Sequence, residues 1–405
     1  MPLVMYYFNQ VAFVGPLTNL LVVPLVGMLV LPAGLLGIIL APSGALLPGL
    51  CWHAAALGLK VVLWIVEHVA QWPFAAATTV TPTVVEISLF FILVGLLFNW
   101  KKQKIYGAML IVLLLAGGLD SAYWTHRRFF NRRMVVTALD VGQGTASVLQ
   151  LPGGYTVLID GGGFSDNSTF DVGRRIVAPF LWRSKIRTVD LVVLSHPNSD
   201  HLNGLIFILN HFNIGEVWSN HEAEDSQGFR SWQKSIADGG IVHTPFNQLP
   251  LNTVYQGVSF QILNPPKKFL QLRKIDPWRD LNNNSLVVRV AFNQVSFLFA
   301  GDVEKEAEAE LTALQDGREL QSTILFVPHH GARSSCTANF IDAVQPRESV
   351  ISAGWKNRYK FPNVKTLERL SEVNSRIWRT DLCGAVSIIT DGSGYTVLTC
   401  RPGCR

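Results

Sequence analysis

Residues 194–204 read LSHPNSDHLNG, and they place two histidines and an aspartate directly behind the apolar run LVVL at 191–194. One interpretation is a polar turn in which Ser195, Asn198 and Asp200 cap the next helix. The other is a metal site, because His and carboxylate side chains at a strand end can converge on a divalent cation that compensates for their desolvation. The stretch alone leaves both interpretations open.

Polar side chains also follow other apolar runs in the chain. The full set is Asp140 after VVTAL, Asp160 after TVLI, His196 with Asp200 and His201 after LVVL, Asp302 after VSFLFAG, and His329 with His330 after ILFV. Loops at one edge of a layered sheet are where side chains from distant segments meet. Two or more metal ions held by His and carboxylate explain five such strand ends better than five separate turns do.

Charge is distributed unevenly along the chain. It has 34 Lys and Arg and 29 Asp and Glu residues, of which only seven precede residue 122. Segments 11–50 and 105–119 have no charged residue and 83–100 has one, whereas a helix crosses a bilayer with about 20 apolar residues. We predict about four membrane crossings within residues 1–122, some of them broken at Pro24 and Pro32.

The first ten residues carry no positive charge. A cleaved signal peptide begins with a positively charged region, so this start is not a signal peptide. The chain begins inside or beside predicted membrane sequence, and we therefore expect it to be a fragment of a longer protein.

From residue 134 to 405 the sequence changes to short β-branched runs separated by Gly, Pro, Asn and Asp. The predicted strands are 134–141, 146–151, 156–160, 191–196, 258–263, 285–292, 295–302, 322–330, 349–354, 385–390 and 395–400. The predicted helices are 172–185, 202–211, 304–314, 338–342 and 363–374. About 270 residues can bury one core as a single α/β or α+β domain, and residues 120–133 are the predicted link to it.

The five cysteines include no CxxC pair, which removes a zinc ribbon from consideration. Cys51 lies in the predicted membrane part. Near the C-terminus, Cys400 and Cys404 in CRPGC could close a small disulfide if the domain faces an oxidising compartment.

The net charge of +5 is modest, but basic residues are clustered. One cluster follows the last apolar segment and the other lies in the predicted helix before LSHPNSDH: Arg127, Arg128, Arg132 and Arg133, then Arg174, Arg175, Arg183, Lys185 and Arg187. Such residues could steer a polyanion towards the site. A solvated face or contact with lipid headgroups explains them equally well.

The motif H-x-N-x-D-H at 196–201, followed by Asp302 and by VPHHG at 327–331, resembles the metallo-β-lactamase fold, whose usual signature is H-x-H-x-D-H. A wider set resembles the hydrolase domain of the ComEC family of DNA-internalisation competence proteins: LDVGQG (139–144), LIDGG (158–162), VGRRIVAPFLWRSKIRTVDLVVLSH (172–196), NNNSLVVRV (282–290), FAGDV (299–303), VPHHGARSS (327–335) and WRTDLCGAVSI (378–388). YYFNQVAFVGPLTNLLVVPLVG (6–27) is similar to the last helices of that family's channel domain.

The resemblance implies a multi-pass α-helical membrane segment over 1–122, followed by an α/β metallo-β-lactamase-like αββα sandwich over 134–405. Family members also carry an N-terminal soluble domain and further channel helices, which supports a fragment. The implied function is DNA uptake in natural transformation, with metal-dependent hydrolysis of one strand and a channel for the other. The expected partners are DNA, the membrane, other competence proteins and the missing part of the channel. We expect the protein in the inner membrane, with its hydrolase domain on the exoplasmic face.

The resemblance also implies roles for individual residues. The implied metal ligands are His196, Asn198, Asp200, His201, Asp302 and His330, with Asp302 as the bridge in a two-metal site. The implied catalytic residues are Asp200, His329 and His330, one histidine being a ligand and the other a phosphate contact or proton donor. Behind them we expect Asp140, Asp160, Asn284 and Ser285, with Asp160 orienting a histidine and a strand-capping turn as the alternative for the last two. The expected DNA-binding residues are Arg174, Arg175 and Arg333.

Two positions depart from the family pattern. Asn198 stands where the general fold has His and ComEC-like proteins often show Asp, and Thr145 stands where an acidic residue commonly follows DVGQG. Asn offers a cation only a neutral carbonyl oxygen, so we expect one tight divalent site and a weaker second one. The expected ion is manganese or zinc, and the oxygen donors without a cysteine ligand favour manganese or magnesium over zinc.

Such an ion would lower the pKa of bound water to about 7 and stabilise charge on the scissile phosphate. Two alternatives to a nuclease remain open. One is a catalytically impaired domain that guides DNA or has a structural role in the transporter. The other is a membrane-tethered hydrolase of a small phosphoester or lipid.

Overall fold

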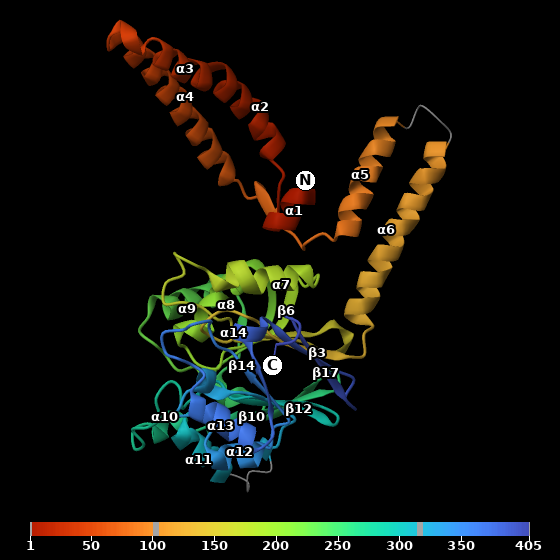
Figure 1. Cartoon of the computed structure of the whole chain (residues 1–405), viewed down its shortest axis with the longest axis vertical. Helices are drawn as coiled ribbons and strands as arrows, with labels where there is room; N and C mark the ends of the chain where they lie inside the picture. The colour runs from red at the N-terminus through yellow and green to blue at the C-terminus, as the bar shows by residue number, and fades with distance from the viewer. Residues whose placement is uncertain (1, 100–104, 314–318, 405) are drawn as a thin grey trace. The chain divides into compact units, whose positions relative to one another are not determined.

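The computed structural model describes residues 2–99, 105–313 and 319–404. The chain forms two compact units, Met1–Trp100 and Lys101–Arg405. The first unit is almost entirely helical. The second begins with one long apolar helix and continues into two β-sheets with their covering helices (Figure 1).

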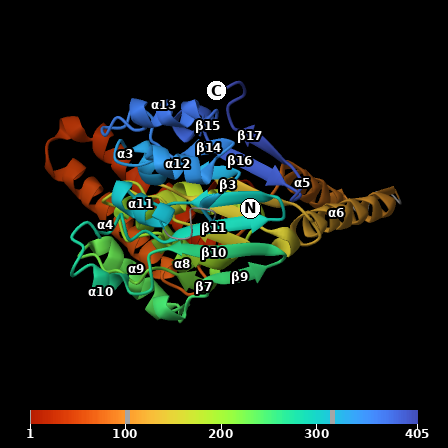
Figure 2. The same ribbon diagram turned by 90° about the horizontal axis from the view of Figure 1, so that it is seen from below.

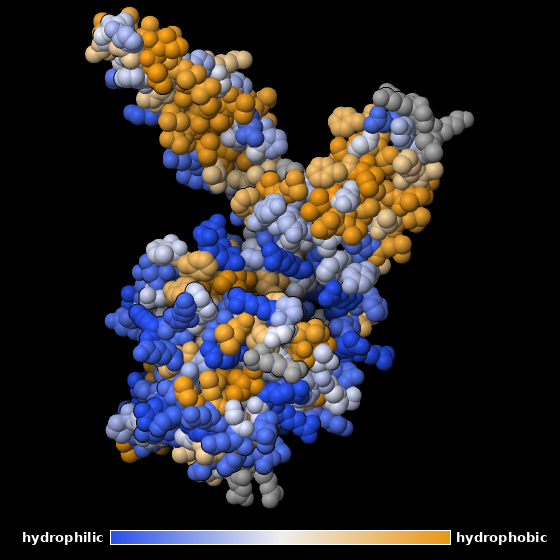
Figure 3. All heavy atoms as spheres, viewed as in Figure 1, coloured by the Kyte–Doolittle hydropathy of each residue, from blue (hydrophilic) through white to orange (hydrophobic). Residues whose placement is uncertain are grey.

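In the first unit, one candidate membrane span runs over Gly15–Ile39 and a second over Leu46–Ala70. The elements of this unit are α1 (Pro2–Phe8), β1 (Gln10–Ala12), α2 (Gly15–Leu25), the π-helical η1 (Val26–Val30), α3 (Leu31–Ile39), η2 (Ala41–Ser43), α4 (Leu46–Ala70), β2 (Ala76–Thr78) and α5 (Val84–Asn99). Strand β1 pairs antiparallel with β2. The apolar side chains of these helices are exposed and cover the surface of the unit (Figure 3).

The predicted breaks at Pro24 and Pro32 are wrong. Pro24 lies inside α2, and Pro32 lies in the first turn of α3, yet one continuous helical span contains both. Proline removes a backbone donor and normally kinks a helix. Here the π-helical turn η1 lies between the two prolines, and such a turn shifts the hydrogen-bond pattern without ending the helix.

The second unit opens with α6 (Ile105–Phe129), which contains a third candidate span, Tyr106–Phe129. Within the described residues three helices are therefore long and apolar enough to cross a membrane, and α5, with 16 residues, is shorter. The predicted link at 120–133 is helical for most of its length, because α6 continues as far as Phe129.

An eight-stranded sheet has the order β17-β16-β3-β4-β5-β6-β7-β8. Its strands are β3 (Met134–Ala138), β4 (Ser147–Gln150), β5 (Thr156–Ile159), β6 (Thr188–Val193), β7 (Asn213–Trp218), β8 (Val242–His243), β16 (Val386–Thr390) and β17 (Tyr395–Thr399). Strands β5 to β8 are parallel. The helices of this half of the domain are η4 (Gly173–Val177), α7 (Ala178–Arg183), α8 (Ser199–His211) and α9 (Gln227–Asp238).

A seven-stranded sheet has the order β15-β14-β13-β12-β11-β10-β9. Its strands are β9 (Asn252–Tyr255), β10 (Val258–Asn264), β11 (Val287–Phe292), β12 (Val295–Phe299), β13 (Ile324–Phe326), β14 (Glu348–Ile351) and β15 (Arg376–Arg379). Strands β12 to β15 are parallel. The nearby helices are α10 (Phe269–Leu272), α11 (Lys305–Ala313), α12 (Ala338–Val344) and α13 (Val364–Glu372), and Figure 2 shows β9 to β11 side by side.

The two sheets face each other across the main core, which takes Met134, Leu149 and Trp218 from one sheet and Phe260 and Phe297 from the other. A second core lies between the seven-stranded sheet and α11 to α13. Apolar runs such as VSFLF are buried on both faces, as expected for strands with a sheet on one side and helices on the other. The predicted αββα sandwich is confirmed, and its layers can be followed in Figure 1.

The predicted strands and helices are each found, with shorter bounds in most cases. The end of the predicted helix 304–314 lies outside the described residues. Elements that the sequence analysis missed are β7, β8, β9, β15, α9, α10 and the short α14 (Thr380–Cys383).

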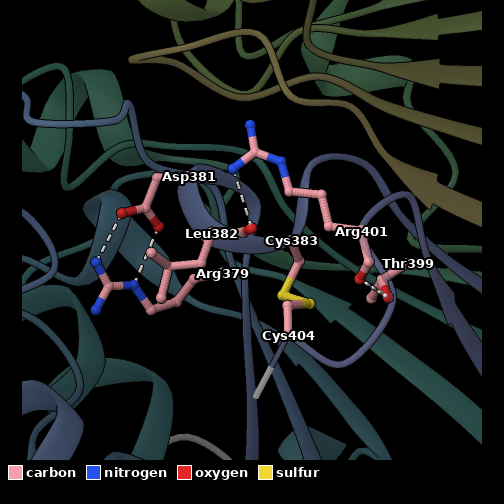
Figure 4. Close-up of a disulfide and its surroundings, with 7 residues drawn as sticks. All are labelled: Arg379, Asp381, Leu382, Cys383, Thr399, Arg401 and Cys404. Atoms are coloured by element: carbon pink, nitrogen blue, oxygen red, sulfur yellow. Dashed lines mark hydrogen bonds and ion pairs between the residues drawn. A yellow bond between two sulfur atoms is a disulfide. The ribbon is translucent and has the colours of Figure 1, made fainter.

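The disulfide predicted within CRPGC is wrong in its pairing. Cys404 bonds to Cys383 of α14 (Figure 4). Cys400 is a free, exposed thiol. Cys400 follows β17, where its backbone N–H donates to Ala385. The chain then turns back, so that Cys404 packs against the main core beside the buried Cys383.

Candidate metal centre

Four predicted site residues from three segments meet at one edge of the two sheets. Asp200 and His201 lie in the first turn of α8, Asp302 follows β12, and His330 lies in η7 (Pro328–Gly331) after β13. One ligand atom from each of the four lies within 4.8 Å of those of the others. We call Asp200, His201, Asp302 and His330 the four-residue cluster.

The cluster forms because parallel strands end at the same edge and α8 starts very close to the sheet. The backbone N–H of Gly204 donates to the carbonyl oxygen of Gly162 at 2.7 Å. A Cβ atom on Gly204 would lie 2.0 Å from the carbonyl oxygen of Gly161. Only glycine permits this approach, so the last residue of the LSHPNSDHLNG stretch sets the position of the helix that carries two of the cluster residues.

The charged side chains of the cluster lie close together. His330 Nε2 lies 3.2 Å from Asp200 Oδ2, and His201 Nε2 lies 3.2 Å from Asp302 Oδ1. Burial alone would raise the pKa of Asp302, but the neighbouring charges of His201 and His330 outweigh it and hold the pKa well below its usual value. Burial would lower the pKa of His201, and the carboxylates of Asp302 and Asp160 raise it well above its usual value instead. Asp302 is therefore an anion, as a metal ligand has to be.

Residues behind the cluster fix both histidine rings. Asp160 ends β5, and its Oδ2 lies 2.8 Å from His201 Nδ1. The same carboxylate accepts hydrogen bonds from the backbone N–H and the hydroxyl of Ser195. His330 Nδ1 lies 2.9 Å from the carbonyl oxygen of Ser352, and because a carbonyl only accepts, Nδ1 carries the proton. The Nε2 atoms of both rings then face the cluster, where a metal ion would take the place of a proton on each.

Buried polar atoms without partners indicate that a cation fits here. Within the part of the chain that the structure describes, His196 Nε2 is buried without a hydrogen-bond partner, and His201 Nε2 and Asp302 Oδ1 are buried 3.2 Å apart but form no well-oriented hydrogen bond. Unpaired buried polar groups are costly and therefore rare. Two imidazole nitrogens and two carboxylates form a donor set that suits manganese, iron or zinc.

His196 and Asn198 do not belong to the four-residue cluster. His196 is fully buried beside it, with Nε2 3.9 Å from Asp302 Oδ2, and burial followed by the charge of His201 lowers its pKa to about 4. Asn198 stands at the N-cap position of α8 without a side-chain capping hydrogen bond, and its side-chain N–H donates to Asn282 Oδ1 at 2.8 Å. This hydrogen bond ties the amide nitrogen to a neighbouring loop and leaves only the neutral Oδ1 atom as a ligand for a second metal site.

We expect calorimetry with Mn²⁺ to detect one tight site, with any second site at least about tenfold weaker, because a neutral amide is a poor cation ligand. Asn198→His should strengthen the second site, while Asn282→Ala, which frees the amide without adding a ligand, should not. Two equally tight sites in the unsubstituted chain would contradict this assignment.

The two adjacent histidines have different surroundings. His330 is buried within the cluster, whereas His329 is 20% exposed, and its Nδ1 lies 3.0 Å from Glu304 Oε1. His329 Nε2 lies 4.0 Å from Asp302 Oδ2. Both residues adopt positive φ angles, 50° and 55°, which is a costly conformation that occurs mostly at functional sites. The geometry points to His330 as the ligand candidate and leaves His329 at the rim.

The remaining predicted supporting residues are more scattered. Ser285 Oγ accepts from the backbone N–H of Asp302 and lies 3.3 Å from His196 Nδ1, so it adjoins the cluster. Asn284 is buried, but it donates to Glu222 and not to a cluster residue. Asp140 accepts only a long hydrogen bond from Gly142, and burial raises its pKa.

The predicted DNA-binding arginines are all exposed. Arg174 and Arg175 lie in η4, where Arg175 stacks over Phe170 at 5.3 Å. Arg333 lies two residues after η7, and its carbonyl oxygen accepts from Arg369. Among the described contacts, none joins these arginines to the cluster.

Three residues near the centre were not predicted as part of it. Ser195 lies inside the decisive stretch, where the sequence suggested only a cap. Glu304 follows Asp302 by two positions, and this spacing was a signal that could have drawn attention to it. Ser352 contributes only a backbone carbonyl, which every residue type has, so no sequence signal existed.

Two family models match separate parts of the chain: the Competence protein family over residues 1–104 and the Metallo-beta-lactamase superfamily over residues 139–355. Similar proteins include ComE operon protein 3 of Bacillus subtilis, 26% identical over 95% of this chain and 50% of the relative. Competence protein ComA of Neisseria gonorrhoeae is 27% identical over 94% of this chain and 48% of the relative. The chain thus spans about half the length of these relatives.

Among solved structures, the metallo-beta-lactamase fold protein YhfI from Bacillus subtilis is similar over 60% of this chain and 95% of that one. The sequence identity is 10% and the TM-score is 0.38. The superfamily match alone covers more than half of the chain. The chain therefore belongs to the metallo-β-lactamase superfamily, and the residues before that domain are similar to the Competence protein family.

Proposed function

We propose that the second unit hydrolyses phosphodiester bonds of incoming DNA with a divalent metal ion, as part of a membrane DNA-uptake protein. The observation that carries the proposal is the four-residue cluster, whose ligand atoms lie within 4.8 Å of one another. When bound, manganese or zinc would supply a water molecule of lowered pKa and would stabilise negative charge on phosphate oxygens.

The protein's own residues have separable roles in this proposal. Asp160 and Ser352 hold the rings of His201 and His330, so that each presents Nε2 to the ion. Hydrolysis adds water across a P–O bond, and the leaving oxygen has to receive a proton. Nδ1 of His329 lies 3.0 Å from Glu304 Oε1. The other ring nitrogen, Nε2, is then the atom at the exposed rim that contacts phosphate or donates this proton.

The similarity to competence proteins over nearly the whole chain supports DNA as the substrate. In this proposal one strand is degraded while the first unit contributes to a channel for the other. Arg174, Arg175 and Arg333 guide the polyanion. The remaining channel segments and other competence proteins are the partners, and the protein lies in the inner membrane with its hydrolase domain on the exoplasmic face.

With Mn²⁺ and the full chain in detergent, we expect linear DNA to be cleaved faster than a small aryl phosphodiester at equal concentration of phosphodiester bonds. A basic surface concentrates a polyanion but not a small ester. The comparison is made by single-turnover cleavage at low and high salt. Cleavage of the small ester alone would favour the small-phosphoester alternative, and no cleavage of either would contradict the proposal.

One observation favours a second candidate, a domain that guides DNA without cleaving it. The side-chain N–H of Asn198 donates a hydrogen bond to Asn282, and His196 lies outside the four-residue cluster. If two ions are required, a centre with one tight site would bind DNA without hydrolysing it. DNA binding that is retained at full metal occupancy, with no cleavage, is the outcome that would identify this candidate.

A further inference from the structure

A pocket of about 840 Å³ lies within the second unit, between the last turns of α6 and the outer face of the eight-stranded sheet. Its lining begins at Tyr123 of α6 and includes outward-facing residues of β3, β16 and β17. Figure 1 shows the end of α6 next to β3 and β17. Because Tyr106–Phe129 is a candidate membrane span, the pocket lies where that span leaves the hydrocarbon region.

Four arginines line this pocket: Arg127, Arg128, Arg133 and Arg183. No Asp or Glu is among its lining residues, and none of the four arginines forms a salt bridge within the described residues. Arg128 donates from Nη1 to the carbonyl oxygen of Lys185, and its buried Nε has no hydrogen-bond partner in the described chain. The carboxylate of Asp190 accepts a hydrogen bond from the backbone N–H of Thr156, and it offsets the charge of Arg128 only in part. The pocket is therefore short of negative charge.

The floor of the same pocket is apolar. Val135, Leu151, Ile389 and Leu398 contribute to it, and Leu398 is 51% exposed although it lies on a sheet face. At the rim, Trp124 lies between two cations, with Arg127 at 5.3 Å and Lys185 at 5.5 Å from its ring. Tryptophan with arginine at the end of a membrane span is typical of the headgroup region.

The pocket lies on the outer face of the eight-stranded sheet, and none of its lining residues belongs to the four-residue cluster. Strands β3, β5 and β6 begin beside the pocket, near Arg133, Thr156 and Ile186, and they lead to Asp140, Asp160 and His196. A six-residue strand such as β6 is roughly 20 Å long. A ligand in the pocket would thus leave the metal centre open to its own substrate.

We propose that this pocket binds the phosphate of an anionic phospholipid, with Arg127, Arg128, Arg133 and Arg183 around the headgroup and the sheet face against the glycerol and upper acyl chain. The volume matches that of sites for small amphipathic ligands. The bound lipid would hold the hydrolase domain at a fixed height on the membrane, with its metal edge directed away from the surface.

The pocket fits a lipid better than a nucleic acid. A nucleic acid would need a groove that follows its backbone, with aromatic faces for its bases, whereas this pocket combines a single basic rim with an aliphatic floor. Anionic headgroups attract juxtamembrane arginines, and Arg127 and Arg128 end a candidate span.

The test is native mass spectrometry of the full chain after delipidation and titration with phosphatidylglycerol or phosphatidylcholine. We expect one phosphatidylglycerol per chain to bind at least about tenfold more tightly than phosphatidylcholine, since phosphatidylglycerol has a net negative charge, whereas the choline cation of phosphatidylcholine offsets its phosphate and repels the arginines. Arg128→Gln combined with Arg127→Gln should weaken binding about tenfold or more. Leu398→Glu, at an exposed position where folding is not at risk, should do the same by repelling the headgroup.

Arg132→Gln is the matched control, because Arg132 has the same charge in the same segment but does not line the pocket. It should leave phosphatidylglycerol binding unchanged. Inorganic phosphate that competes fully at millimolar concentration would mean a free-anion site, and a single-stranded oligonucleotide that displaces the lipid would mean a nucleic-acid site. Either result, or equal binding of the two lipids, overturns the proposal.

Discussion

Alanine at His201, or asparagine at Asp302, is expected to abolish metal-dependent cleavage by this protein. Both residues lie in the four-residue cluster, and each offers a buried ligand atom to the ion. A metal ion stabilises a phosphoryl transition state by several kcal/mol, so losing it should reduce the rate at least about a thousandfold. The measurement is the single-turnover rate on linear DNA with saturating Mn²⁺.

His211→Ala is the matched control for this experiment. His211 lies on the same helix, α8, but it is exposed, and its described contacts are with Phe207, whose carbonyl oxygen lies near Nδ1 and whose ring stacks on the imidazole. It should cleave at the unsubstituted rate. Asp302→Asn keeps the shape of the side chain and removes a buried charge, so circular dichroism should show an intact fold. Cleavage that persists in either cluster variant would refute the ligand assignment.

The sheet framework could be predicted because its central strands are apolar on both faces. VSFLF in β12 and TVLI in β5 have no competing helical pattern, and both are fully buried. Strand β7 was missed because Gly215 and Glu216 interrupt its apolar run. A Cβ atom on Gly215 would lie 2.4 Å from the carbonyl oxygen of Asp190. The close approach of β7 to β6 therefore requires a glycine, and this glycine weakens the strand pattern in the sequence.

The candidate metal centre could be predicted in part for a similar reason. A carboxylate or histidine at a strand end is conspicuous in the sequence, and the parallel strands bring Asp160, Asp302 and His330 to one edge. His329 and His330 both have positive φ, yet only the ring of His330 belongs to the cluster. Two adjacent residues of the same type carry no sequence signal for that choice.

Two groups of basic residues lead to opposite predictions for the side of the membrane on which the hydrolase domain lies. Lys101, Lys102 and Lys104 lie in a short loop between two apolar segments, and short basic loops tend to remain cytoplasmic. This loop lies outside the described residues. If α6 then crosses the membrane, the domain emerges on the exoplasmic face. The arginines after α6 argue for the cytoplasm, although long domains translocate largely regardless of charge.

The disulfide shifts this balance towards the exoplasmic face. Cys383 and Cys404 are bonded over a separation of 21 residues (Figure 4), and such bonds persist in oxidising compartments and are rare in the cytosol. Closing a loop of this length stabilises a domain by about 3 kcal/mol in the chain-entropy treatment. A cytoplasmic domain would lose that contribution.

We therefore expect three of the five cysteines, Cys51, Cys336 and Cys400, to react with a thiol reagent when the protein is denatured without reduction, and all five after reduction. Cys383→Ser should free the thiol of Cys404 and lower the thermal stability, while Cys400→Ser should leave the stability unchanged.

Protease added to intact cells, with any outer membrane opened, should digest the domain, because it would lie on the accessible face. Five reactive thiols without reduction, together with protection from protease until the inner membrane is lysed, would place the domain in the cytoplasm and contradict the proposed topology.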